Sequence, residues 1–67
     1  MLNADLLRNK IRENGMTIVF ISEKSGILRE TLYNKMAGKG EFKASEIQAL
    51  ARVLKLTKGE RDAIFFA

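Results

Sequence analysis

Four polar side chains that can hydrogen-bond the edge of a nucleic-acid base fall within six residues of the chain. They are the guanidinium, carboxylate, phenol and amide groups of Arg29, Glu30, Tyr33 and Asn34. In a helix, this spacing places all four on one face. On an isolated helix, such a face would be interpreted as a solvated surface. The elements around it therefore decide between a binding face and an ordinary exposed one.

Each of the four side chains has a defined candidate role at a base pair. We expect Arg29 to donate two hydrogen bonds to O6 and N7 of guanine. Glu30 can accept a hydrogen bond from N4 of cytosine or hold Arg29 in position. Tyr33 can contact a thymine methyl group or a phosphate, and Asn34 can pair with adenine or bind a phosphate. The sequence leaves these alternatives open.

Four other residues are candidates for contacts with phosphate. Thr17 is predicted to cap a helix, and the N-terminal end of a helix favours anions. Lys35, Lys39 and Lys43 are positively charged and lie within or just after the segment that carries the four polar side chains. Lysine neutralises phosphates without reading sequence, so these residues would give a salt-dependent grip.

Glycines mark the places where the chain is expected to turn, because glycine tolerates the left-handed conformation that ends a helix. Gly15 follows a first predicted helix over residues 3–14. Thr17 is expected to begin a short second helix that ends at Gly26. The third helix is then predicted over residues 28–37, and it carries the four polar side chains.

Apolar periodicity completes an all-helical prediction. Leu28, Leu32 and Met36 recur every four residues and are predicted to form the buried stripe of the third helix. A fourth helix is predicted over residues 44–54 from its apolar spacing. A capping-box pattern predicts a fifth helix over residues 58–66.

The chain contains little that would support catalysis or metal binding. It has 67 residues with no His and no Cys, a net charge of +4 and a sequence pI of about 9.8. Without these side chains the usual nucleophile pairs and metal ligands are missing. We therefore expect no enzyme activity, no cofactor and no small-molecule substrate. The basic charge favours a polyanionic partner, and the lack of a long apolar run predicts no membrane span.

The segment over residues 17–38 combines a cap, a small residue, a glycine hinge and a second glycine stop. The residues concerned are Thr17, Ser22, Glu23, Lys24, Gly26, Ile27, Arg29, Leu32 and Gly38. Together they resemble the helix-turn-helix of the Cro/repressor (Xre-type) family of phage and bacterial regulators. The similarity extends more weakly over nearly the whole chain. The chain departs from the family pattern at Ile18, where Gln is usual, and at Leu28, where Ser or Thr is common.

The resemblance implies a compact five-helix, lambda-repressor-like domain over residues 1–67, whose third helix enters the major groove. It implies sequence-specific binding to double-stranded DNA as a phage or prophage transcriptional regulator in the bacterial cytoplasm. Two alternatives remain. One is a protein-interaction module, such as an anti-repressor or an antitoxin, and the other is a non-specific DNA binder.

Aromatic residues outside the third helix have two candidate uses. Phe42 is predicted to fill the core rather than stack on a base, because single-strand binders present several aromatic side chains on one surface. At the C-terminal end, Ile64 and one phenylalanine are expected to close the core. The alternative is that Phe65 or Phe66 forms part of a homodimer interface.

Overall fold

Caps and glycines divide the chain into five α-helices in the computed structural model, which describes residues 1–67. The helices are α1 (Ala4–Glu13), α2 (Ile18–Ser25), α3 (Arg29–Met36), α4 (Ala44–Val53) and α5 (Lys58–Phe65). There are no strands, so the all-α prediction is confirmed, and each helix ends within about one residue of its expected position. None of the five is long and apolar enough to cross a membrane.

Side-chain caps explain why three of the helices begin where they do. Asn3, Thr17 and Thr57 each accept a hydrogen bond from the backbone N–H group three residues later. At the start of α5, Glu60 returns a bond by accepting from the backbone N–H of Thr57 at 2.8 Å. These bonds satisfy N–H groups that have no partner inside the helix.

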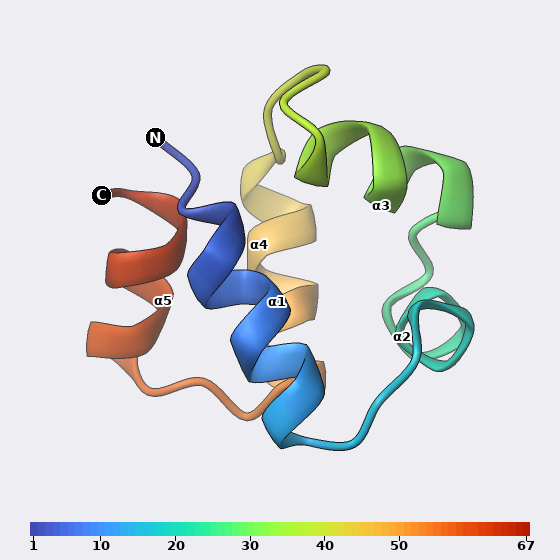
Figure 1. Cartoon of the computed structure of the whole chain (residues 1–67), viewed down its shortest axis with the longest axis horizontal. Helices are drawn as coiled ribbons and strands as arrows, with labels where there is room; N and C mark the ends of the chain where they lie inside the picture. Colours follow the sequence, from blue (N-terminus) through green and yellow to red (C-terminus); the bar gives the residue numbers. More distant parts are fainter.

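The core is made only of hydrophobic side chains, and all five helices contribute to it. Its ten buried residues are Leu7, Ile21, Ile27, Leu32, Met36, Ile47, Leu50, Leu54, Ile64 and Phe65. Helix α2 packs against α3 and α4, whereas α5 packs against α1 and α4. Figure 1 shows α1, α4 and α5 grouped together, with α2 and α3 on the other side of the molecule.

The prediction that Leu28 belongs to the buried stripe of α3 is wrong. Leu28 is 73% exposed, and its φ of −61° and ψ of 143° are extended rather than helical. It therefore precedes the first helical residue, Arg29, and its side chain leaves the line set by Leu32 and Met36. The neighbouring Ile27 is buried instead.

The C-terminal phenylalanines have different environments. Phe65 is only 6% exposed, and its ring meets that of Phe42 edge to face, with 5.6 Å between the ring centroids. This contact confirms that Phe42 packs onto the core. It also removes Phe65 from the predicted dimer interface, because the ring is already covered within one chain. Phe66 is 60% exposed and remains available.

Candidate nucleic-acid interface

The corner between α2 and α3 is built from one glycine and two serines. Gly26 has a φ of 78°, in the left-handed region, and its N–H group donates to the carbonyl oxygen of Ser22. The Ser22 hydroxyl donates to the carbonyl oxygen of Ile27 at 2.5 Å. The Ser25 hydroxyl accepts from the Ile27 N–H at 3.2 Å. The chain therefore reverses through a corner whose polar groups are satisfied locally.

The four side chains predicted to contact bases lie together on the outer face of α3. Arg29, Glu30, Tyr33 and Asn34 are all exposed, and Leu32 and Met36 lie buried on the opposite face. No hydrogen bond or ion pair of the structure engages the side chains of the four. The structure thus brings together one cation, one carboxylate, one phenol and one amide, each free to meet an external partner.

Thr17 stands at the N-terminal end of α2, as predicted. Its side-chain oxygen accepts a hydrogen bond from the Phe20 N–H at 3.1 Å. The residue is exposed, so its hydroxyl hydrogen is left to donate outward. The position combines a hydroxyl donor with the partial positive charge of a helix N-terminus.

Lys39 and Lys43 lie in the loop over residues 37–43, which links α3 to α4. Both side chains are exposed. The backbone N–H of Lys39 donates to the carbonyl oxygen of Asn34 at 2.8 Å, which ties the beginning of the loop to the last turn of α3. The loop therefore carries two free ammonium groups directly after the helix that bears the polar face.

Lys35 differs from the other predicted phosphate-binding residues. Its side chain is only 15% exposed, and its Nζ lies 2.7 Å from Oε1 of Glu46 on α4. To reach a phosphate, the ammonium would have to leave this ion pair. In this structure Lys35 is therefore held in an internal ion pair, and the predicted phosphate contact would require that pair to open.

Glu46 remains ionised beside Lys35 although its side chain is largely covered. Burial raises the pKa of Glu46, but the hydrogen bond from Lys35 and the one from the backbone N–H of Lys43 outweigh it. The net result is a pKa below the ordinary value of 4.5. The two residues are separated by eleven positions in the sequence, and no helical periodicity links them, so sequence analysis could not have paired them.

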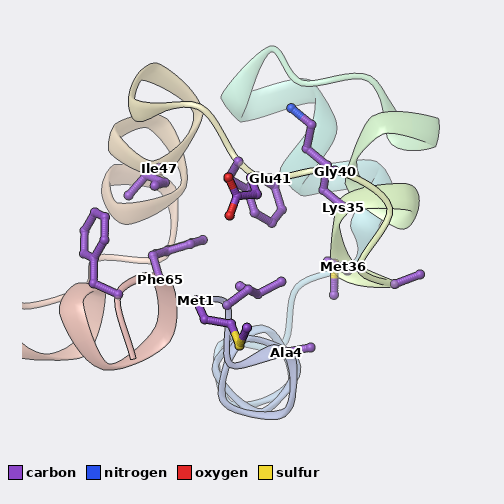
Figure 2. Close-up of a pocket in the computed structure, with 13 residues that line it drawn as sticks. Met1, Ala4, Lys35, Met36, Gly40, Glu41, Ile47 and Phe65 are labelled. Carbon is purple, nitrogen blue, oxygen red and sulfur yellow. The ribbon is translucent and has the colours of Figure 1, made fainter.

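A separate apolar pocket of about 670 Å³ lies between the N-terminal residues, the end of α3, the loop and α5. Figure 2 shows Lys35 and Gly40 on one side of this pocket and Ile47 and Phe65 on the other. Nine of its thirteen lining residues are hydrophobic. The pocket therefore offers mainly apolar surface, and the charged residues in its lining are Lys35 and Glu41.

Comparison of the chain with protein-family models, with curated proteins and with solved structures gave no match.

Proposed function

We propose that this protein binds duplex DNA in a sequence-specific manner, as a phage or prophage transcriptional regulator of the Cro/repressor type. In this proposal α2 and α3 form a helix-turn-helix, and α3 enters the major groove. The observation that carries the proposal is the outer face of α3, where Arg29, Glu30, Tyr33 and Asn34 are exposed and unpaired. A helix with such a face fits the width of the major groove.

The positions of the other polar groups support separate roles on DNA, with some residues binding phosphates and others contacting bases. Thr17 can donate to a phosphate at the start of α2, and Lys39 and Lys43 can neutralise phosphates next to the end of α3. These contacts would position the protein without reading sequence. Arg29 would then donate to guanine, with Glu30 accepting from cytosine or bracing Arg29. The net charge of +4 agrees with a polyanionic partner.

Phe66 supports a second part of the proposal, a homodimer. Its ring is exposed at the end of α5, and a pair of such surfaces could face one another across a two-fold axis. Two α3 helices about 34 Å apart would then meet successive turns of one face of the duplex, which requires a palindromic site.

Selection from random duplex sequences at two salt concentrations tests the proposal. We expect one enriched sequence, with an affinity that falls steeply as salt rises because phosphate contacts release counterions. Two inverted half-sites in the enriched sequence would support the dimer, and a single half-site would contradict it. A steep salt dependence without enrichment would instead identify a non-specific DNA binder.

A single substitution tests the assignment of the reading residue. Arg29→Ala should cost about 1–3 kcal/mol of binding free energy and relax the preference at one base pair. Lys39→Ala is the matched control, since losing a phosphate contact should weaken binding to all sequences about equally. If Arg29→Ala leaves both affinity and preference unchanged, Arg29 does not read a base.

A protein-interaction module is the second candidate function, and a specific observation favours it. Val19 and Phe20 are exposed on the outer side of α2, and the Lys24 ammonium lies 5.6 Å from the centroid of the Phe20 ring. Exposed apolar side chains on a short helix suit contact with another protein. Failure to bind any duplex at low salt would favour this function over DNA binding.

A further inference from the structure

Lys35 lies beneath the loop that joins α3 to α4. A methyl group placed on Gly40 would be 3.9 Å from Cγ of Lys35, so the loop crosses directly over the lysine stem. The Lys35 ammonium lies 6.0 Å from the centroid of the Phe42 ring. Phe42 in turn meets Phe65 of the core. Figure 2 shows Lys35 next to Gly40 on the same side of the pocket.

One carboxylate oxygen connects three parts of this region. Oε1 of Glu46 accepts a hydrogen bond from Nζ of Lys35 at 2.7 Å and another from the backbone N–H of Lys43 at 2.8 Å. It therefore joins the last turn of α3, the end of the loop and the first turn of α4. Both side chains are largely covered, at 15% and 16% exposure, so this pair is screened less than an exposed ion pair.

We propose that Lys35 and Glu46 are positioning residues that hold the loop with Lys39 and Lys43 in a fixed place relative to α3. This inference rests on the proposed function, in which those two lysines bind phosphate. Lys35 itself does not touch DNA. Without the ion pair, the loop would have to be ordered again on binding, and that ordering lowers affinity.

Lys35→Met tests the inference because methionine keeps most of the apolar stem and removes the ammonium. We expect binding to every duplex to weaken roughly tenfold, the order of the cost of ordering two lysine side chains on binding. The base preference should not change. The slope of log affinity against log salt should also stay unchanged. If Lys35 were a phosphate contact, the slope would fall by about 0.9.

The charge-swapped double variant Lys35→Glu with Glu46→Lys separates positioning from contact. It restores opposite charges with the same net charge, but an ammonium at position 46 cannot accept the hydrogen bond from the Lys43 N–H. We therefore expect affinity to recover in part, above that of Lys35→Glu alone, because the attraction between the two positions is re-established. A negative charge at position 35 would weaken binding further if that position faced a phosphate. The control for the single variant Lys35→Met is Lys58→Met on α5, which removes the same unit charge at an exposed position.

Hydrogen exchange of the free protein provides a readout that needs no DNA. In Lys35→Met, the amides over residues 38–43 should exchange faster, while those of α1 and α5 keep their rates. Binding is measured at a temperature where circular dichroism shows every variant to be folded. The inference is overturned if Lys35→Met changes neither hydrogen exchange nor DNA affinity. It is also overturned if the slope of log affinity against log salt falls and the charge-swapped double variant does not restore it. If the original protein binds no duplex, the proposed function fails, and exchange alone decides whether Lys35 holds the loop.

Discussion

Leu28 shows how the residue at which a helix begins determines whether a neighbouring side chain is buried. It precedes α3 with an extended backbone, and its side chain makes no capping hydrogen bond. The first N–H groups of α3 therefore lack the side-chain partner that Thr17 gives α2 and Thr57 gives α5. Because the Leu28 side chain is exposed, it contributes little hydrophobic stabilisation, so leucine is not the best residue for stability at this position.

We predict that Leu28→Ser stabilises the protein by about 1 kcal/mol, because serine has the backbone preference and the oxygen that an N-cap requires. Thermal or urea unfolding measures the change. Thr57→Ala is the matched control at another helix start, and it should lower the free energy of unfolding by about 1 kcal/mol. A destabilised Leu28→Ser protein would mean that the leucine side chain makes a contact worth more than the missing cap.

At the scale of elements, the corner between α2 and α3 depends on the backbone conformation of Gly26. Nothing crowds the place where a Cβ would stand, so the constraint on this residue comes from its positive φ rather than from neighbouring atoms. Ser22 and Ser25 add hydrogen bonds that hold the reversed chain. The angle between the two helices is therefore set by a few local interactions.

We predict that Gly26→Ala lowers the free energy of unfolding by about 1–2 kcal/mol, since an L-residue resists the left-handed conformation. Gly59→Ala provides the opposite case. Gly59 lies within α5 and has no positive φ, and an added Cβ would make only an ordinary contact, 4.0 Å from Oγ1 of Thr57. Alanine should therefore stabilise the protein by about 0.5–1 kcal/mol. Equilibrium unfolding of both variants checks the pair, and effects of equal sign would contradict the conformational argument.

The sequence was informative wherever a local signal determines the structure. Caps, glycines and apolar spacing together predicted five helices, and the apolar spacing predicted Leu32 and Met36 as buried. The exposure of the four polar residues of α3 followed from the same periodicity. Leu28 was misplaced because its burial depends on whether the first helical turn begins one residue earlier or later. The ion pair between Lys35 and Glu46 was not predicted, because it depends on tertiary packing that brings residues of two helices together.

At the scale of the whole molecule, all ionisable groups are outside the core, whose ten residues are hydrophobic. The response of stability to pH must therefore come from ion pairs outside the core, among them the largely covered pair of Lys35 and Glu46. Lys10 on α1 is paired with Glu60 on α5, and the backbone N–H of Asn3 donates to the carbonyl oxygen of Ile64. These contacts link the first helix to the last.

The hydrogen bond from Lys10 lowers the pKa of Glu60 below its ordinary value of 4.5, and donating that bond to Glu60 raises the pKa of Lys10 above 10.5. A carboxylate with a lowered pKa contributes stability above pH 4.5 and loses it as the pH falls. A lysine with a raised pKa contributes stability below pH 10.5 and loses it as the pH rises further. We therefore predict a plateau of the thermal midpoint between these limits, with a decline on both sides.

Glu60→Gln tests the acidic side of this profile. The variant should melt below the original protein at pH 7, and the difference should shrink as the pH falls from 4.5 toward about 2. Glu23→Gln, at an exposed position of α2 that makes no ion pair, should keep a constant offset. A difference for Glu60→Gln that persists at low pH would show that this carboxylate acts through packing rather than charge.

The separation between the outer face of α3 and the rest of the fold affects how such a protein can evolve. Arg29, Glu30, Tyr33 and Asn34 support neither the hydrophobic interior nor any internal bridge, so descendants can exchange them at little cost to folding. Under the proposed function, new target preferences would then arise by substitution at a few codons, while selection preserves the remaining framework.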